Sequence, residues 1–256
     1  MQGDEVNIMS FFDGSIEDET AKISERQKEF MTSTGNDEFD RSLGGGFPLK
    51  SLSLIMGNQG SGKTILAQQI CFGALKESKK SVTYITSQQM VRDLVTNMEN
   101  MSWDVKKFFI EGKLKVIPVY TRVRSVLESP WLLDLLEETI LEDESDIIVV
   151  DSLAHFATDR DEKRLTNFFV LMKGLCGNGK TIIINVPQYF VNRLDYEYIK
   201  AVCTVVLELS MIDQKDDIIR VLKLLKFQTV GERFQAIIPF EVDPAVGIRI
   251  SAIMEA

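Results

Sequence analysis

The sequence has few of the residues that build metal centres and nucleophilic active sites. It contains one histidine, His155, and three cysteines, Cys71, Cys176 and Cys203, in 256 residues. The cysteines are scattered, odd in number and lack metal-ligand spacing, so they predict neither a zinc site nor a disulfide framework. A single histidine without a nucleophile signature also argues against a Ser-His-Asp triad. We expect the three cysteines to be small apolar side chains of a core in a reducing compartment.

Positive charge is also scarce. The chain has 29 Lys and Arg against 38 Asp and Glu, a formal net charge of −9. Proteins that bind nucleic acid usually carry a basic patch that neutralises phosphates, and no basic run stands out here. The nearest candidates are best interpreted as solvated surface: Lys76, Lys79, Lys80, Arg122 and Arg124. We therefore expect no nucleic-acid partner.

Long apolar runs are missing as well. No run approaches the roughly 18 residues that span a bilayer, and the polar, acidic N-terminus does not resemble a signal peptide. We expect a soluble cytoplasmic protein. Residues 1–30 are acidic without a sustained period, which predicts a flexible extension. Its short apolar patch at residues 8–12 leaves open a docking role. A single domain is expected over residues 31–256.

Strand-like and helix-like segments alternate from residue 52 onwards. Short apolar runs predict strands at 52–56, 82–86, 114–119, 147–151 and 181–186. Helical periodicity predicts helices at 63–76, 90–101, 125–141 and 166–176. Three further strands, at 202–209, 219–227 and 234–242, follow one another directly. This order predicts an α/β fold with a mostly parallel sheet, helices on both faces and antiparallel C-terminal edge strands.

A phosphate-binding loop stands between the first of these strands and the first of these helices. It fits the pattern G-x-x-x-x-G-K-[ST] at every fixed position: Gly57, Asn58, Gln59, Gly60, Ser61, Gly62, Lys63 and Thr64. Glycines let the backbone wrap around phosphates, and the helix N-terminus points its N–H groups at the anion. We expect Lys63 to reach the β- and γ-phosphates of ATP and Thr64 to bind Mg²⁺.

A carboxylate ends the apolar strand at 147–151. Asp151 at the carboxyl tip of a buried strand is typical of a residue that binds Mg²⁺ directly or through water. The alternative is a cap for the next helical segment. We favour the first interpretation, so Thr64 and Asp151 are the expected metal residues and ATP with Mg²⁺ the expected cofactor.

The segment before the loop carries a family resemblance. Residues 33–56 read Ser-Thr-Gly-Asn-Asp-Glu-Phe-Asp-Arg-Ser-Leu-Gly-Gly-Gly-Phe-Pro-Leu-Lys-Ser-Leu-Ser-Leu-Ile-Met. They resemble the "TG…LD…LGGG.P.GS" segment that precedes the P-loop in RecA-like ATPases of the KaiC group. The stretches 111–116 and 242–248 add a resemblance to the FlaH (ArlH) family of archaellum accessory proteins. The likeness covers residues 33–252.

This resemblance implies a RecA-like fold and a cytoplasmic ATP-binding subunit at the membrane base of the archaeal swimming motor. It also implies three partners, namely the motor ATPase, the membrane platform protein and a ring scaffold. Members of the family tend to form rings themselves, and their hydrolysis is weak or undetected.

The sequence departs from the KaiC-type pattern where an attacking water is activated. One or two glutamates follow the strand after the P-loop helix in that group, whereas Gln88 and Gln89 occupy these positions here. An amide orients water but is a very poor proton acceptor, and losing a general base costs about 10²–10⁴-fold in rate. The catalytic residues therefore stay unassigned, and slow or absent hydrolysis is expected.

A second departure concerns the Lys-x-Arg finger that KaiC-type rings extend into a neighbouring site. The best match is Lys226-Phe227-Gln228, in which a glutamine stands at the arginine position. Lys223 and Arg233 remain alternatives. An arginine finger is worth roughly 10³–10⁵ in rate, so its loss also indicates slow turnover.

Three functions remain open. The first is a nucleotide-dependent assembly switch of the archaellum motor, with loops near Gln88, His155 and Gln188 responding to ATP. Asn185 and Gln188 are candidates for reading the γ-phosphate. The second is an active KaiC-like ATPase, which the two glutamines disfavour. The third is a RecA/RadB-like recombinase. It is disfavoured because segment 187–200 mixes acidic and basic residues instead of forming a phosphate-binding stripe.

Overall fold

The computed structural model describes residues 30–119, 131–157, 162–191, 195–214, 217–228 and 234–251. The strands of its large sheet are β3 (Leu52–Gly57), β4 (Val82–Thr86), β5 (Leu114–Pro118), β6 (Ile147–Asp151), β7 (Thr181–Pro187), β8 (Val205–Gln214), β9 (Asp217–Phe227), β10 (Ile237–Asp243) and β11 (Gly247–Ile250). A separate small pair is formed by β1 (Met31–Thr32) and β2 (Phe47–Pro48). The predicted extension at residues 1–30 lies outside the described residues, apart from Phe30.

The helices connect and cover these strands. They are α2 (Asp37–Ser42), α3 (Lys63–Lys76), α4 (Val91–Asn100), α5 (Lys106–Ile110), α7 (Trp131–Glu142), the 3₁₀ helix η1 (Leu153–His155), α8 (Glu162–Gly177), α9 (Gln188–Val191) and α10 (Tyr196–Val202). None of the described helices is long and apolar enough to cross a membrane.

The large sheet confirms the predicted fold class. In the described residues its nine strands lie in the order β11-β10-β9-β8-β3-β7-β6-β4-β5. The pairs from β8 through β3, β7, β6 and β4 to β5 are all parallel, and those from β8 to β11 are antiparallel. The first strand of the C-terminal series was predicted from residue 202, but Val202 ends α10 and the strand begins at Val205.

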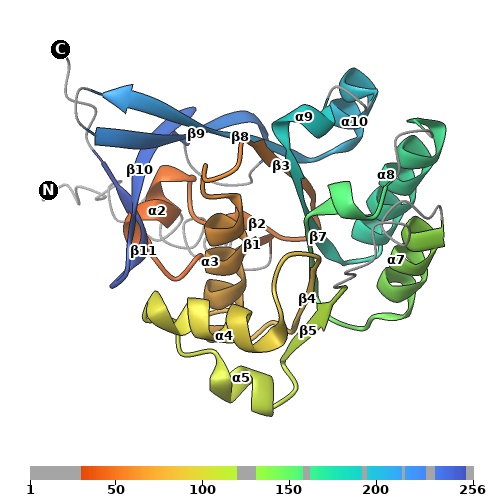
Figure 1. Cartoon of the computed structure of the whole chain (residues 1–256), viewed down its shortest axis with the longest axis horizontal. Coiled ribbons are helices and arrows are strands. Elements are labelled where there is room, and N and C mark those ends of the chain that lie inside the picture. Colours follow the sequence, from red (N-terminus) through yellow and green to blue (C-terminus); the bar gives the residue numbers. More distant parts are fainter. Residues whose placement is uncertain are drawn as a thin grey trace, which may run out of the picture.

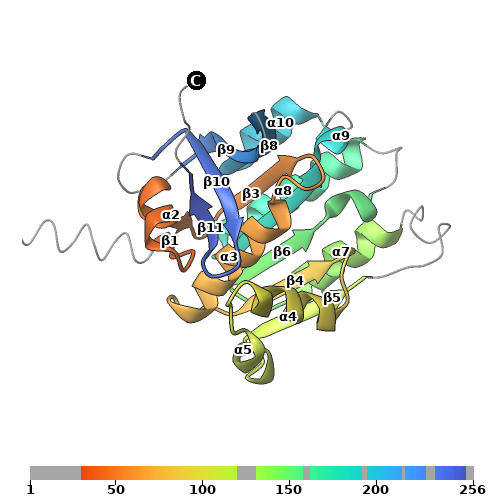
Figure 2. The ribbon, with the colours of Figure 1, turned by 60° about the vertical axis from the view of Figure 1, so that its left-hand side comes forward.

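Helices cover both faces of the parallel strands (Figure 1), with α3 and α4 on one side and α7 and α8 on the other. Successive strand side chains point to opposite faces, and here both directions are buried. Ile55 and Val149 therefore pack with the α3 side, while Leu54 and Ile148 belong to the α8 side. Figure 2 shows the antiparallel extension β8–β11 continuing the sheet past α3. Cys71, Cys176 and Cys203 are buried and free, as predicted.

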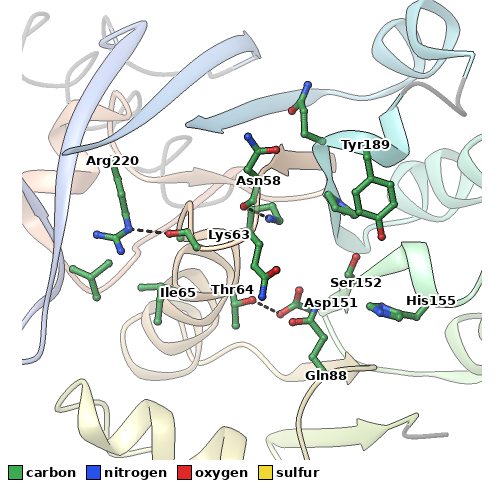
Figure 3. Close-up of a pocket in the computed structure, with 16 residues that line it drawn as sticks. Asn58, Lys63, Thr64, Ile65, Gln88, Asp151, Ser152, His155, Tyr189 and Arg220 are labelled. Atoms are coloured by element: carbon green, nitrogen blue, oxygen red, sulfur yellow. Dashed lines mark hydrogen bonds between the residues drawn. The ribbon is translucent and has the colours of Figure 1, made fainter. Parts of the chain in front are cut away.

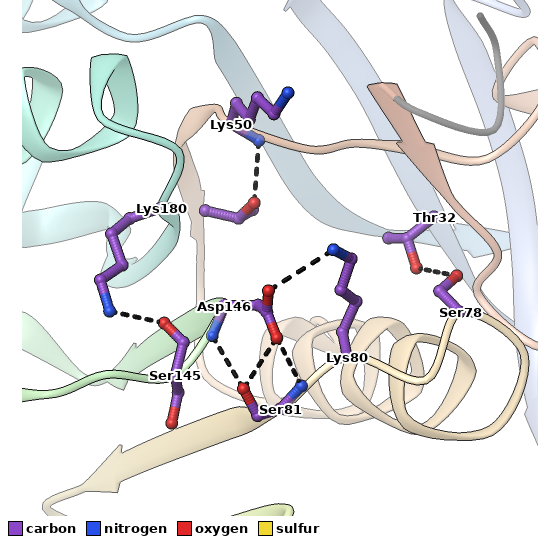
Figure 4. Close-up of polar contacts among 9 residues, drawn as sticks. Thr32, Lys50, Ser78, Lys80, Ser81, Ser145, Asp146 and Lys180 are labelled. Carbon is purple, nitrogen blue, oxygen red and sulfur yellow. Dashed lines mark hydrogen bonds and ion pairs between the residues drawn. The ribbon is translucent and has the colours of Figure 1, made fainter.

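Polar side chains tie together the amino ends of the parallel strands (Figure 4). The Asp146 carboxylate accepts hydrogen bonds from the Ser81 N–H at 2.9 Å and the Ser81 hydroxyl at 2.8 Å, and it pairs with Lys80 at 3.4 Å. Burial opposes ionisation of Asp146, but these donors outweigh it and hold its pKa below the usual value. Lys180 donates to the Ser145 carbonyl at 2.8 Å. These contacts connect strands and loops at the amino edge of the sheet, which is the edge opposite to the P-loop.

Helix α3 packs directly on the segment that follows β1. A Cβ added to Gly73 would overlap the Ser33 carbonyl oxygen and the Thr34 backbone. Glycine is therefore required here by packing, although it is a poor residue for a helix interior. Gly174 in α8 is different, because a Cβ there would meet nothing within 4 Å.

We expect Gly73→Ala to lower the free energy of unfolding by about 2 kcal/mol or more, since the helix or the segment must move. Gly174→Ala is the matched control. It should raise stability by roughly 0.5–1 kcal/mol, because alanine gains helix propensity without a clash. Thermal or urea unfolding of both variants measures the difference. Equal changes in the two variants would contradict the close approach of α3 to residues 33–34.

Candidate functional site

A cavity of about 620 Å³ opens at the carboxyl edge of the parallel strands. The strand register brings Thr86, Asp151 and Asn185 into one row at this edge, on β4, β6 and β7. Figure 3 shows the lining side chains, which come from the P-loop and α3, from the segments that follow β4, β6 and β7, and from β9 and β10. The lining residues are Asn58, Gln59, Gly60, Gly62, Lys63, Thr64, Ile65, Gln88, Asp151, Ser152, His155, Pro187, Gln188, Tyr189, Arg220 and Val242.

The P-loop connects β3 to α3 and needs its glycines for two reasons. Gly60 and Gly62 have φ of 81° and 100°, in the left-handed region that side chains rarely adopt. The extension also presses on the loop. A Cβ on Gly57 would overlap the Leu209 carbonyl, and one on Gly62 would lie 3.1 Å from the Phe240 ring. The loop is therefore shaped by its own backbone and by β8 and β10.

Lys63 begins α3 and lies against the loop. Its ammonium donates to the carbonyl oxygens of Gly57 and Asn58, both at 2.8 Å. Burial lowers the Lys63 pKa from its ordinary value, and the negative charge of Asp151 opposes this effect. The N-cap of α3 is Gly62, which offers no side chain to the first N–H groups of the helix. These donors and the helix dipole are therefore directed at the cavity.

Asp151 is the polar centre of the site. The residue is 2% exposed. Its Oδ2 accepts from the Thr64 hydroxyl at 2.9 Å and the Tyr84 phenol at 2.8 Å, and its Oδ1 accepts from the Asn185 amide at 3.0 Å. The N-cap of η1 is Ser152, without a side-chain cap bond. The Asp151 side chain thus serves the cavity and not the next helix, and the two predicted metal residues lie in contact.

Tyr84 is a site residue that sequence analysis missed. Burial raises its pKa well above the ordinary value, and the charge of Asp151 raises it further, so the phenol stays protonated and donates. The signal was an aromatic residue in the middle of a buried strand. That signal carries no functional meaning until the pairing of β4 with β6 is known.

Gln88 and Gln89 follow β4, but only Gln88 lines the cavity. Gln88 is exposed and lies beside Asp151 in Figure 3. The backbone N–H groups of both glutamines donate to the Thr86 hydroxyl at 3.2 and 3.3 Å. The Gln89 side-chain oxygen is buried, with no hydrogen-bond partner in the described part of the chain. The geometry therefore singles out Gln88 as the glutamine that faces a ligand.

Of the other candidate residues, two line the cavity and one contacts Asp151 from within the sheet. Gln188 and His155 line the cavity, and the His155 Nδ1 lies 2.9 Å from the Ser87 hydroxyl. Asn185 is fully buried and acts on the site through Asp151.

Arg220 on β9 is the second residue that sequence analysis missed. Its Nε donates to the Gly60 carbonyl at 3.1 Å. It lines the cavity at the end away from Asp151 (Figure 3). No motif marks this arginine, because β9 belongs to the antiparallel extension and its register was not predictable.

Two of the predicted finger residues have partners within this chain. Lys226 donates to the carbonyls of Lys200 and Ala201 at 3.1 and 2.9 Å. Lys223 lies 3.8 Å from Glu208. Arg233 lies outside the described residues, and Gln228 is exposed just after β9. Among the described residues, the cations that line the cavity are Lys63 and Arg220.

These residues fit a nucleoside triphosphate with Mg²⁺. The Ser61 hydroxyl is buried and has no partner among the described residues, as expected of a group reserved for a ligand. In the described ranges, no group of three or more His, Cys, Asp or Glu is placed so that it could hold a metal ion by itself. This suits Mg²⁺, which is commonly held by one or two carboxylates plus substrate phosphates, here Asp151 with the Thr64 hydroxyl. When bound, the ion would neutralise phosphate charge next to Asp151.

Comparisons with known proteins agree with this geometry. The family described as "ATPase: KaiC" matches residues 32–255. The archaeal flagellar ATP-binding protein FlaH of Sulfolobus acidocaldarius is 33% identical over 225 residues, which cover 86% of this chain and 96% of that protein.

Solved structures show the same relationship. The flagellar accessory protein FlaH of Methanocaldococcus jannaschii superposes with a TM-score of 0.73 at 26% identity, covering 84% of this chain and 96% of that one. A KaiC-like protein of Pyrococcus horikoshii gives 0.67 at 22% identity, covering 87% and 99%, and this likeness shows the fold alone.

Lys63→Ala should weaken binding of ATP at least about tenfold, because a charge-assisted contact to phosphate is lost. Calorimetry with Mg²⁺ and ATP measures the effect. Lys107→Ala, a change of an exposed lysine on α5, is the control and should leave affinity unchanged. An unaltered affinity of the Lys63 variant, with its fold intact by circular dichroism, would remove the phosphate site from the P-loop.

Proposed function

Because this chain belongs to the KaiC family of ATPases, and within it to the FlaH proteins, we propose that it is an ATP-binding regulatory subunit of the archaellum motor. ATP with Mg²⁺ binds in the cavity at the carboxyl edge. The bound nucleotide fixes one conformation of the surrounding loops, and turnover is slow or absent. The names of the relatives support ATP binding and the association with the archaeal flagellum.

The observation that carries the proposal is an amide where an ATPase needs a base. Gln88 is the group that follows β4 and faces the cavity beside Asp151. Asp151 itself accepts hydrogen bonds from Thr64, Tyr84 and Asn185 and is the expected Mg²⁺ residue, so we do not assign it to the attacking water. A water near Gln88 would be oriented without a strong proton acceptor, which costs about 10²–10⁴-fold in rate.

The small number of cations in the cavity also favours slow hydrolysis. Lys63 and Arg220 are the cations lining the described cavity, and Arg220 lies at the end away from Asp151. Lys226 is held by two carbonyl groups of its own chain. The described residues of this chain place no arginine beside Asp151, and the position that matches the arginine of the finger is Gln228, so we propose that developing phosphoryl charge is less stabilised than in working ATPases.

Assembly is the proposed output of the site. A ligand that favours one conformation stabilises it by its differential affinity. We propose that ATP promotes ring formation and contact with the motor ATPase, the membrane platform protein and the ring scaffold. The protein is then cytoplasmic and peripheral to the membrane, and it needs no nucleic acid. The second candidate, an active KaiC-like ATPase, shares the nucleotide site and differs in turnover.

Wild-type turnover should be below about one per minute, against typical enzyme values near 10 per second. Gln88→Glu should raise phosphate release at least about tenfold, because it supplies a carboxylate at the cavity wall. Gln89→Glu is the matched control and should stay at the wild-type rate, since Gln89 does not line the cavity. Steady-state phosphate release decides, with Lys63→Ala as background. Brisk wild-type turnover would favour the active-ATPase alternative.

A further inference from the structure

A group of hydroxyl and imidazole side chains lies on the cavity wall next to Asp151. Ser152 and His155 line the cavity from the turn that follows β6 (Figure 3). Ser87, at the end of β4, lies behind them. Its hydroxyl oxygen is 2.9 Å from the His155 Nδ1 and accepts the Ser152 backbone N–H at 3.2 Å. Nothing in the P-loop chemistry described above requires this arrangement.

The Ser87 hydroxyl is the partner of the His155 Nδ1. Its single hydrogen has three acceptors in reach: the Nδ1 at 2.9 Å and the Asp151 and Ser152 carbonyls, each at 3.4 Å. Either atom can donate across the 2.9 Å contact, and we take Ser87 as the donor to Nδ1. A neutral imidazole whose Nδ1 accepts carries its own hydrogen on Nε2. In the described residues Nε2 has no partner, so this N–H is available to a ligand in the cavity.

Ser152 supplies a second unused donor. The residue is 2% exposed, and its hydroxyl has no hydrogen-bond partner in the described chain. A buried hydroxyl without a partner costs free energy, which a ligand oxygen would recover. Both donors stand beside the Asp151 carboxylate. That end of the cavity also holds Thr64, whereas Arg220 marks the opposite end.

From this geometry we propose that Ser152 and His155 bind the terminal phosphate of the nucleoside triphosphate and distinguish it from a diphosphate. The inference rests on the proposed function, because it needs a nucleotide in this cavity. A phosphate oxygen accepts the hydrogens of the Ser152 hydroxyl and the His155 Nε2. A diphosphate held by the same P-loop ends short of this wall and makes neither contact.

Ser87 connects this contact to the segment that carries Gln88 and Gln89. The His155 ring holds the Ser87 hydroxyl, and the Ser87 N–H donates to the Asp151 carbonyl at 3.0 Å. Movement of the ring toward a phosphate therefore alters the anchor of residues 87–89. The conformation of the loop before α4 therefore depends on whether the terminal phosphate is present. This loop lies on the surface, where a partner can contact it.

The binding test compares ATP and ADP by calorimetry in the presence of Mg²⁺. His155→Ala and Ser152→Ala should each weaken ATP binding about tenfold and leave ADP binding within about twofold, because only ATP brings a terminal phosphate to these donors. Arg220→Ala is the comparison and should weaken both nucleotides equally. Ser102→Ala removes a hydroxyl that bonds the Pro244 carbonyl outside the cavity and should change neither.

The relay test measures hydrogen exchange of the peptide that contains residues 87–89 with ATP and with ADP. The wild type should show slower exchange with ATP. His155→Gln keeps a donor near the Nε2 position but loses the Nδ1 acceptor. It should retain ATP binding within about threefold and lose the exchange difference, and Ser87→Ala should lose that difference as well.

Failure of this inference is distinguishable from failure of the proposed function. A wild-type ratio of ATP to ADP affinity in both His155→Ala and Ser152→Ala overturns the phosphate contact, even if Lys63→Ala abolishes binding. Equal losses of ATP and ADP in these two variants overturn it too, because they indicate a structural role. If wild-type protein binds neither nucleotide, both the inference and the proposed function are wrong.

Discussion

The nucleotide site depends on one buried carboxylate and the three donors that surround it. A buried charge is tolerated only where hydrogen bonds replace its lost hydration. Asp151 receives them from Thr64 on α3, Tyr84 on β4 and Asn185 on β7. The Asp151 side chain on β6 therefore connects the P-loop helix α3 to the two neighbouring strands, β4 and β7. Removing any donor leaves the carboxylate under-satisfied, and removing Asp151 leaves three donors without an acceptor.

The second constraint on the site comes from the antiparallel extension. β8 and β10 approach the P-loop closely, since a Cβ on Gly57 would overlap the Leu209 carbonyl and one on Gly62 would lie 3.1 Å from the Phe240 ring. Arg220 on β9 bonds the Gly60 carbonyl. The loop is thus held between the parallel strands and the extension. A change in the loop on nucleotide binding has a direct path to β8–β11. The wall at Ser152 and His155 gives a second path, through Ser87, to the segment before α4.

Much of the architecture was predictable because long periodic segments have one physical explanation. Parallel strands buried on both faces read as apolar runs, and the P-loop and Asp151 were identifiable from their places at strand ends. Short elements such as α2, α9 and α10 were missed, since four to seven residues make fewer than two helical turns and show no periodicity. Tyr84 and Arg220 were missed for another reason. Their roles arise from strand order and register, which no local pattern encodes.

Gln88 and Gln89 show that a sequence pattern can also select more residues than the site uses. Sequence comparison with KaiC-type patterns indicates that both Gln88 and Gln89 stand where a carboxylate is expected. Only the fold separates them, because the turn after β4 directs Gln88 to the cavity and buries the Gln89 oxygen. One position therefore carries the chemical argument for slow turnover.

The central claim is that ATP stays intact in this site and changes assembly by being bound. Native mass spectrometry soon after mixing with Mg²⁺ and either ATP or ADP, within a time shorter than one predicted turnover, tests both halves of the claim in one spectrum. It reports the number of chains in each particle and the mass of the nucleotide that each chain retains. We predict particles of more chains with ATP than with ADP, each site holding ATP. Sites that hold ADP after incubation with ATP, or equal chain numbers with both nucleotides, would contradict the account.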